Sequence, residues 1–150
     1  VPKKKGREYI DQYLERSKGI DQFMKDIVTV AKNEGYVETM FHRRRYIPEI
    51  NSNNFIVRQF GARAAMNTPI QGTAADIMKI AMLKVYRRLK EEHLSANIIL
   101  QIHDELLIEA KEEEKEQVKK VLKECMENAV QLDIPLKVET SEATNWYDVK

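Results

Sequence analysis

Residues 97–110 read Asn-Ile-Ile-Leu-Gln-Ile-His-Asp-Glu-Leu-Leu-Ile-Glu-Ala. Two short runs rich in isoleucine and leucine flank the polar residues 103–105, and this pattern predicts a β-hairpin. Apolar residues then recur at spacings of three and four over 118–130, which indicates a helix, and the extended run 136–139 is expected to add a strand. Two strands, a helix and a further strand packed over a long helix predict an α+β fold with an antiparallel sheet.

The first 50 residues are predicted to be mostly helical. Glycine and proline account for only 5 and 4 of the 150 residues, so the chain has few helix breakers. Apolar residues at helical spacing predict two amphipathic helices divided near Gly19, and Gly35 is expected to close the second. Short apolar pieces interrupted by arginines and Pro48 predict a loop or a short ribbon over 36–50.

Two more helices are expected before the hairpin. The first is expected over about 54–66 and to end at Thr68, because the residue before a proline avoids helical dihedral angles. The second is expected over about 72–93, with a wide apolar face that indicates a central core helix.

The composition excludes several classes of protein. Cys125 is the single cysteine, so no internal disulfide can form, and the cysteine and the three histidines lack the spacing of a zinc site. No apolar run approaches the roughly 20 residues that a membrane-spanning helix needs, and no signal-peptide pattern follows the basic N-terminus. These observations predict a soluble protein of the reducing cytoplasm, with no membrane partner.

A formal net charge of +1 hides an asymmetry along the chain. Residues 1–90 carry 18 Lys and Arg against 9 Asp and Glu, whereas residues 91–150 carry 7 against 15. The basic clusters at 3–5, 43–45 and 87–88 are suited to the phosphates of a nucleic acid. Such clusters also occur as solvated helix faces, so the charge pattern leaves both interpretations open.

The tip of the expected hairpin carries two adjacent carboxylates, Asp104 and Glu105, beside His103. Like charges at a tight turn repel each other, and a divalent cation bound by their oxygens would relieve that repulsion. Polar residues are also ordinary turn chemistry, so an exposed turn without a metal is the alternative.

A second candidate site surrounds the small residues at 72–75. Small side chains at a helix start let another backbone approach closely, and Arg63, Asn67 and Gln71 offer donors suited to phosphates, sugars or base edges in the minor groove. The alternative is a capped helix N-terminus whose alanines pack against the sheet.

Five segments together resemble the C-terminal part of bacterial family A DNA polymerases, of the DNA polymerase I type. These segments are 41–48, 63–69, 71–76, 101–106 and 146–147. Their order and spacing are similar to those of the family over essentially the whole chain, so the resemblance is more specific than any single motif.

The resemblance implies both a fold and an activity. The fold would be a helix-rich distal fingers portion at 1–35, followed at 36–150 by the C-terminal part of the palm with an antiparallel sheet, a β-hairpin and long packed helices. The activity would be template-dependent transfer from deoxynucleoside triphosphates to a primer 3′-hydroxyl by two Mg²⁺ ions, in DNA replication and repair. The setting would be the bacterial cytoplasm, in association with the nucleoid.

The resemblance also implies roles for particular residues. Asp104 would be a catalytic ligand of the metal ions, Glu105 would be a nearby carboxylate that supports the metal site, and His103 would lie beside the primer terminus. The residues that would contact the primer–template DNA in its minor groove are Arg63, Asn67 and Gln71.

Two parts of the family pattern are not found in this sequence. One is the second metal-binding aspartate, and the other is the fingers helix that holds the incoming nucleotide. The chain is therefore expected to be inactive by itself and to need the upstream polymerase segment, in a longer chain or from another polypeptide. A non-catalytic nucleic-acid-binding module and a metal-dependent nuclease are the alternatives, but neither explains the joint occurrence of the five segments.

Overall fold

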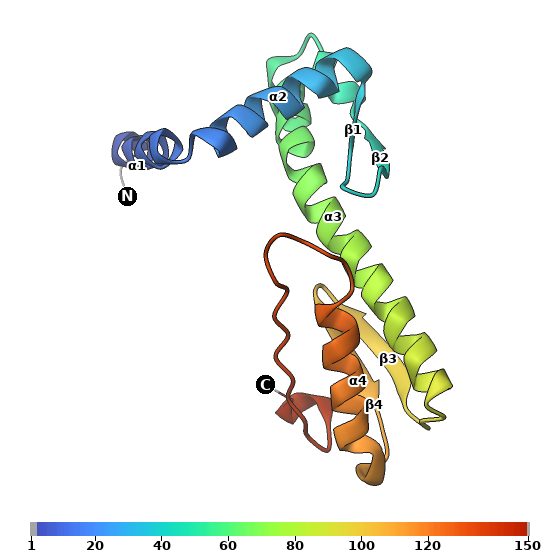
Figure 1. The fold of residues 1–150 in the computed structure, drawn as a ribbon. Coiled ribbons are helices and arrows are strands. Elements are labelled where there is room, and N and C mark those ends of the chain that lie inside the picture. The colour runs from blue at the N-terminus through green and yellow to red at the C-terminus, as the bar shows by residue number, and fades with distance from the viewer. Residues whose placement is uncertain (1–2, 150) are drawn as a thin grey trace. The chain divides into compact units, whose positions relative to one another are not determined.

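The computed structural model describes residues 3–149, with side chains from residue 5 onward. These residues form two compact units, unit 1 (Val1–Thr73) and unit 2 (Ala74–Lys150). The helix α3 (Phe55–Glu91) contributes its first part to unit 1 and its last part to unit 2 (Figure 1).

Unit 1 consists of two helices, a β-hairpin and the first part of α3 (Figure 1). The remaining elements of unit 1 are α1 (Lys3–Arg16), α2 (Lys18–Glu34), β1 (Tyr36–Glu38), β2 (Arg44–Tyr46) and the 3-10 helix η1 (Pro48–Asn51). Gly35 ends α2 with a φ of 77°, and its N–H donates to Ala31 O, which confirms the predicted closure. The predicted ribbon is also confirmed, because β1 and β2 pair antiparallel.

The break between α1 and α2 lies at Ser17, two residues before Gly19, so the predicted division near Gly19 is confirmed. The Ser17 N–H still donates to Tyr13 O at 3.0 Å, which completes the last turn of α1. The backbone of Ser17 then leaves the helical region, with φ of −116° and ψ of 58°, while Gly19 continues the first turn of α2.

A small apolar core holds unit 1 together. Its buried residues come from α2, the hairpin, η1 and α3, and they are Ala31, Val37, Ile47, Ile50 and Ala65. Removing these side chains from water stabilises the packing of the first part of α3 against the hairpin and η1.

Helix α3 begins where the sequence predicts. The Asn54 Oδ1 accepts the N–H groups of Ile56 at 2.9 Å and Val57 at 3.4 Å, which caps the helix N-terminus. The predicted break at Thr68-Pro69 is wrong, because Pro69 lies inside α3. The two helices expected at about 54–66 and 72–93 are therefore one helix.

Unit 2 contains the last part of α3, a β-hairpin and one further helix (Figure 1). Its other elements are β3 (Asn97–Ile102), β4 (Glu105–Glu109), the 3-10 helix η2 (Glu112–Glu114), α4 (Lys115–Glu127) and the 3-10 helix η3 (Trp146–Asp148). The predicted hairpin is confirmed as an antiparallel pair with Ile102 opposite Glu105. The predicted helix is confirmed as well, although it ends at Glu127.

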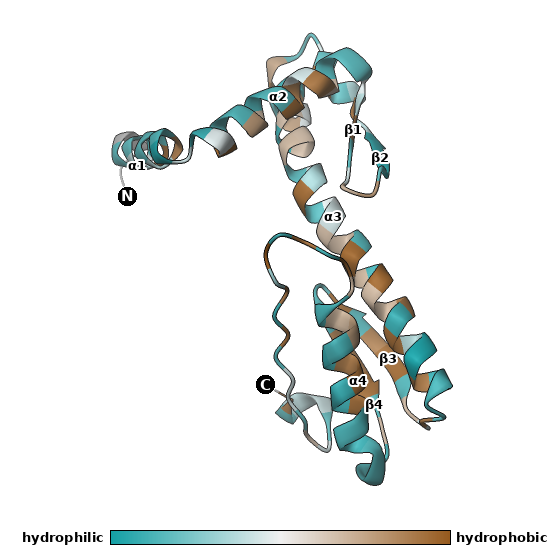
Figure 2. Cartoon of the chain, in the orientation of Figure 1, coloured by the Kyte–Doolittle hydropathy of each residue, from teal (hydrophilic) through white to brown (hydrophobic). Residues whose placement is uncertain are grey.

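The core of unit 2 lies where α3, α4 and the hairpin pack together. Its buried residues are Val85, Leu89, Ala96, Val118 and Val121. Leu106 and Ile108 of β4 pack against this core, so the alternation of a strand places Glu105 and Leu107 on the other face of the sheet. Figure 2 shows the apolar residues along β3, β4 and the last turns of α3.

The predicted strand at 136–139 is wrong, because no strand follows α4 in the described part of the chain. The Val138 N–H donates to Glu127 Oε1 at 3.2 Å, and the Glu142 carboxylate pairs with Lys119 at 3.0 Å and with Lys115 at 3.5 Å. These contacts hold the segment against α4, so its backbone does not join the sheet.

The fold class is α+β, as predicted, and residues 3–149 contain two sheets of two antiparallel strands each. None of the helices within residues 3–149 combines the length and apolar character that crossing a membrane requires. The predicted division into fingers at 1–35 and palm at 36–150 is a functional one and stays a prediction.

Candidate functional site

The turn between β3 and β4 consists of two residues, His103 and Asp104. His103 has a φ of 50°, in the left-handed region that glycine or asparagine usually occupies in such turns. The Gln101 Nε2 donates to His103 O at 2.9 Å and supports the turn from the adjoining strand. A histidine in this region costs about 1–2 kcal/mol of strain, and such strained residues cluster at functional sites.

The Asp104 and Glu105 carboxylates are both exposed at this tip. Within residues 3–149 neither carboxylate has an ion-pair or hydrogen-bond partner. Asp104 lies in the turn itself, and Glu105 opens β4 on the face of the sheet away from the core. Both side chains are therefore accessible to a ligand from solvent.

The donor chemistry of this tip suits Mg²⁺. This ion takes oxygen ligands and is typically bound through one or two carboxylates together with substrate phosphates and water. No group of three or more His, Cys, Asp or Glu side chains that could hold a metal occurs in the described part of the chain. The carboxylates of Asp104 and Glu105 suit Mg²⁺ as two of its ligands, but two carboxylates alone do not complete its coordination.

The predicted DNA-contact residues Arg63, Asn67 and Gln71 lie on α3 in unit 1, and all three are exposed. A step of four residues turns a helical side chain by about 40°, so the three share one face of the helix. Their guanidinium and amide groups present donors along about 12 Å of that face. The structure thus groups these three residues in unit 1, and it groups residues 103–105 in unit 2.

The small residues of α3 do not form the helix N-terminus that the sequence suggested, because Gly72 lies in the middle of α3. A Cβ on Gly72 would lie 2.7 Å from Thr39 Cγ2, and a Cβ on Gly61 would lie 2.7 Å from Ile50 N. The glycines therefore let α3 pack closely against the hairpin and η1 within unit 1.

The turn of the first hairpin, residues 39–43, bonds to α3 at this point. The Met40 N–H donates to Thr73 Oγ1 at 2.9 Å, and Arg43 Nη2 donates to Gly72 O at 3.0 Å. These bonds lie in the same helical turn as Gln71, on a different side of the helix.

A third bond joins the hairpin to α3 before Pro69, where Arg45 Nη1 donates to Thr68 Oγ1 at 3.3 Å. We call the bonds of Met40, Arg43 and Arg45 to α3 the hairpin clamp. The sequence pattern around 71–76 did not indicate this role for Thr73. The available signal was only its hydroxyl, which lies four residues after Pro69 and can donate to the Pro69 carbonyl one helical turn earlier.

The arginines at 43–45 are engaged within unit 1. Arg44 Nε donates to Glu38 Oε1 at 2.8 Å, and its guanidinium lies 4.5 Å from the Tyr36 ring centroid. The hydrogen bond from Arg44, followed by that from His42, holds the pKa of Glu38 below its ordinary value. This basic cluster therefore serves the fold of the hairpin.

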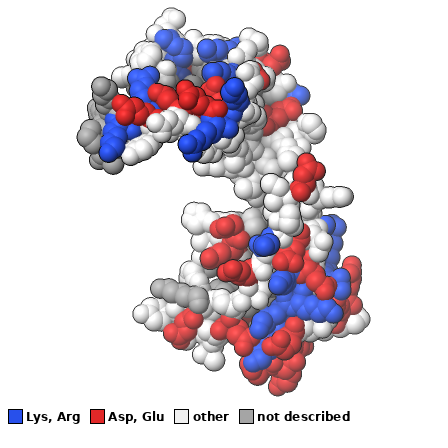
Figure 3. Space-filling model, turned by 60° about the vertical axis from the view of Figure 1, so that its left-hand side comes forward, with Lys and Arg blue, Asp and Glu red and all other residues white. Residues whose placement is uncertain are grey.

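Charge still distinguishes the two units. Unit 1 carries 13 Lys and Arg against 8 Asp and Glu, and unit 2 carries 12 against 16. Figure 3 shows acidic and basic side chains interspersed on the visible face of each unit. The net positive unit is the one that carries the exposed face of Arg63, Asn67 and Gln71.

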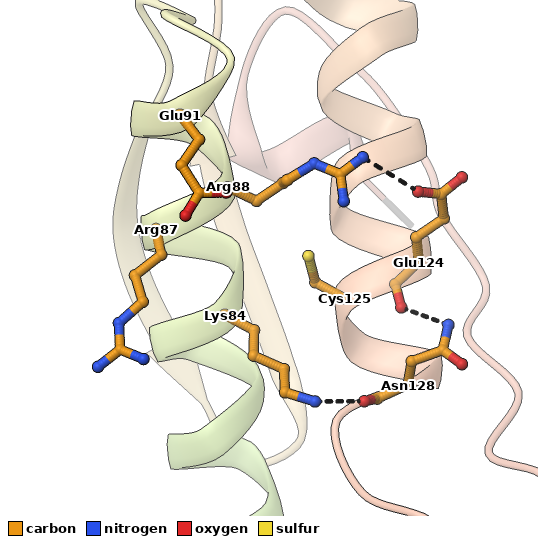
Figure 4. Close-up of a pocket in the computed structure, with 7 residues that line it drawn as sticks. All are labelled: Lys84, Arg87, Arg88, Glu91, Glu124, Cys125 and Asn128. Carbon is orange, nitrogen blue, oxygen red and sulfur yellow. Dashed lines mark hydrogen bonds and ion pairs between the residues drawn. The ribbon is translucent and has the colours of Figure 1, made fainter.

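An open cleft of about 400 Å³ lies between the end of α3 and α4 in unit 2 (Figure 4). Lys84 Nζ donates to Asn128 O at 2.6 Å, and Arg88 Nη2 lies 3.7 Å from Glu124 Oε2, so both cations tie the two helices together. Burial raises the pKa of the Cys125 thiol, which lies between the helices. A thiol with a raised pKa is a poor nucleophile at neutral pH, so Cys125 is not a candidate nucleophile.

Comparison with known proteins identifies the family. The family model for DNA polymerase family A matches residues 1–148. The chain is 51% identical over all of its 150 residues to DNA polymerase I from Bacillus subtilis (strain 168), and 51% identical to DNA polymerase I from Caldicellulosiruptor bescii. The chain spans 17% and 18% of the length of these two relatives.

A solved structure agrees with these sequence matches. The POL domain of Pol1 from M. smegmatis, in complex with DNA primer-template and dNTP, is similar over 91% of this chain and 24% of its own, with a TM-score of 0.87 and 42% identity. Sequence and fold therefore point to the same family as the resemblance. The chain belongs to DNA polymerase family A.

Proposed function

We propose that this chain is part of a DNA-directed DNA polymerase and supports template-dependent nucleotide transfer to a primer 3′-hydroxyl. The observation that carries the proposal is the exposed pair Asp104 and Glu105 on a strained two-residue turn. The similar structure with DNA primer-template and dNTP supports these two molecules as ligands. DNA replication and repair in the bacterial cytoplasm, in association with the nucleoid, would be the setting.

Residues 103–105 would have different roles in the reaction. Asp104 and Glu105 would hold Mg²⁺, whose Lewis acidity would stabilise charge on the transferred phosphate, with two ions in the complete site. His103 would place its ring beside the primer terminus, because its backbone is held by the turn and by Gln101. Two rigid strands behind the turn would limit movement of these groups.

The exposed face of α3 would bind the primer–template. Arg63 would donate to phosphate or sugar oxygens, and the amides of Asn67 and Gln71 would reach acceptors in the minor groove. Contacts of this kind position the DNA without reading most of its sequence, which suits an enzyme that must copy any template.

We expect the 150-residue chain to bind divalent ions weakly and not to extend a primer by itself. Two carboxylates leave most of the coordination of an ion to water, substrate phosphates and residues outside this chain. The upstream polymerase segment would supply those residues and the site for the incoming nucleotide.

A chimera tests the proposal. These 150 residues replace the matching ones of the Bacillus subtilis relative, and primer extension is measured with Mg²⁺ and four deoxynucleotides. We expect extension by the chimera and a loss of about 100-fold or more with Asp104→Ala, since metal ions contribute several kcal/mol to such reactions. Glu109→Ala, at the other end of β4, is the control and should extend normally. Full extension by Asp104→Ala would refute the metal-ligand role.

The second candidate is a non-catalytic nucleic-acid-binding module, which the exposed face of Arg63, Asn67 and Gln71 on the basic unit favours. It predicts DNA binding by the 150-residue chain that weakens with salt and is indifferent to Mg²⁺. It also predicts that the chimera extends no primer.

A further inference from the structure

We propose that the hairpin clamp positions Asn67 and Gln71 for contact with DNA by keeping α3 continuous through Pro69. This inference rests on the proposed function, which makes Asn67 and Gln71 DNA contacts. It adds Thr73 and Arg43 as positioning residues that act through the helix backbone.

Pro69 is the weak point of this face of α3. It has no N–H, so the Ala65 carbonyl lacks its ordinary helical donor, and the proline ring crowds the preceding turn. A proline inside a helix costs about 3 kcal/mol or more and usually kinks or breaks it. Asn67 and Gln71 lie on opposite sides of Pro69, so a kink there would change the spacing of their amides.

The clamp encloses this weak point. Its three bonds are Arg45 to Thr68 at 3.3 Å, Arg43 to Gly72 at 3.0 Å and Met40 to Thr73 at 2.9 Å. The first bond lies before Pro69 and the other two lie after it. One hairpin therefore holds the two helical segments on either side of the proline.

Thr73 has a double role in this arrangement. Its Oγ1 accepts the Met40 N–H and also donates to the Pro69 carbonyl. One hydroxyl thus connects the hairpin turn to the backbone of the proline itself. Thr73 follows Gln71 by two residues, which is about 200° around the helix, so it acts without touching the ligand of Gln71.

The turn that carries the clamp is itself well fixed. Thr39 is 4% exposed, and its Oγ1 accepts the N–H groups of Phe41 and Arg43, both at 3.2 Å. The Thr39 N–H donates to Arg43 O at 3.0 Å. Because these bonds fix the turn, we expect the turn to set the position of the α3 backbone and not to adjust to it.

Binding of a fluorescent primer–template to the 150-residue chain tests the inference, measured by anisotropy well below each variant's unfolding temperature. We expect Gln71→Ala to weaken binding by about fivefold or more, as for loss of a hydrogen-bond partner. Thr73→Val keeps the shape of the side chain and removes the hydroxyl, and it should weaken binding by about threefold or more. Thr73→Ser should restore binding to within about twofold, because the hydroxyl returns.

Thr29→Val is the matched control. The Thr29 Oγ1 donates to Lys25 O on α2, in the same i to i−4 manner, and has no contact with the hairpin clamp. This variant should bind DNA like the unsubstituted chain. Arg43→Lys, which keeps the charge and shortens the reach, gives a second clamp variant should Thr73→Val fold poorly.

The double variant separates positioning from simple stability. If the clamp positions Gln71, then Gln71→Ala should cost much less in the Thr73→Val background than in the unsubstituted chain. A merely structural threonine would lower the unfolding temperature and leave the cost of Gln71→Ala unchanged, which would overturn the inference.

The same measurements distinguish failure of the proposed function from failure of the inference about the hairpin clamp. If the unsubstituted chain binds the primer–template and Gln71→Ala binds it equally tightly, the DNA-contact role of this face is wrong, and the inference falls with it. If Gln71→Ala weakens binding while Thr73→Val and Arg43→Lys do not, the DNA face stands and only the clamp is overturned.

Discussion

Gly61 and Gly19 are both helical glycines, but only Gly61 lies against another backbone. A Cβ on Gly61 would lie 2.7 Å from Ile50 N, whereas a Cβ on Gly19 would meet nothing within 4 Å. Gly61→Ala should destabilise unit 1 by about 1–3 kcal/mol, because the buried backbone of η1 must shift. Gly19→Ala should instead stabilise α2 by about 0.5–1 kcal/mol. Urea unfolding followed by circular dichroism checks both, and equal effects would contradict the packing described here.

His103 offers a test of strain at the proposed active site. Its φ of 50° suits glycine, so His103→Gly should leave the hairpin as stable as before or stabilise it by up to about 1 kcal/mol. The same change removes the ring, so we expect weaker primer extension by the chimera. A stabilised hairpin with unchanged extension would show that the ring does not act at the primer terminus.

The sequence predicted the exposed acids of the β3–β4 turn better than the residues that support the proposed DNA-contact face of α3. Asp104 and Glu105 were identifiable because adjacent carboxylates between two apolar strands are unusual. Thr73 and Met40 were not, because their hydrogen bond joins residues 33 positions apart and depends on how the hairpin folds back on α3. The roles of the residues at 103–105 and on the α3 face stay predictions until they are tested.

At the scale of elements, α1 is the least supported helix. None of its described side chains is buried, and its large apolar residues Tyr9, Ile10 and Tyr13 are each more than half exposed. Hydrogen exchange should therefore be much faster in α1 than around the buried Val85 and Leu89 of α3. Equal protection of the two segments would mean that this chain covers α1 in solution, for example by self-association.

The ion pairs of Glu142 predict that the segment after α4 is held against α4 in a pH-dependent way. Hydrogen bonding to Lys119, and then the charge of Lys115, hold the Glu142 pKa below its ordinary value of 4.5. Because the pKa of Glu142 is lowered in the folded state, its ion pairs stabilise the fold fully above pH 4.5. This stabilisation is lost as the pH falls through the folded-state pKa of Glu142. The fluorescence of Trp146, the single tryptophan, should therefore change in acid as the segment leaves α4.

Glu142→Gln tests which carboxylate is responsible. This variant should show a changed Trp146 fluorescence already at pH 7, and its acid transition should be reduced. Glu139→Gln, at a neighbouring exposed position without these ion pairs, is the control and should behave as the unsubstituted chain. Identical pH profiles for Glu142→Gln and the unsubstituted chain would contradict the assignment.

Element boundaries show where sequence patterns stop being sufficient. The β3–β4 hairpin, the start of α3 near Asn54 and the closure at Gly35 were predicted because each depends on local chemistry. The continuation of α3 through Pro69 was not, because bonds from the hairpin offset a local preference for a break. The strand expected at 136–139 failed for a similar reason, since side chains of α4 hold that segment.

At the scale of the whole molecule, family membership and activity have different support. Membership rests on 51% identity over 150 residues and on a fold match with a TM-score of 0.87. Activity stays a proposal, because this chain spans 17% of the length of its Bacillus subtilis relative. The composition narrowed the class of protein and the charge pattern left two interpretations open, whereas the specific chemistry was indicated by five short segments in their order along the chain.

Asp104→Asn in the chimera is the most direct test of the central claim, because it removes the charge of one proposed metal ligand with almost no change in shape. Primer–template affinity and the rate of extension are measured on the same preparation. The polymerase account predicts that affinity stays within about twofold while the rate falls by about 100-fold or more, since the lost charge acts on the metal and not on DNA. An unchanged rate, or an affinity that falls together with the rate, would contradict it.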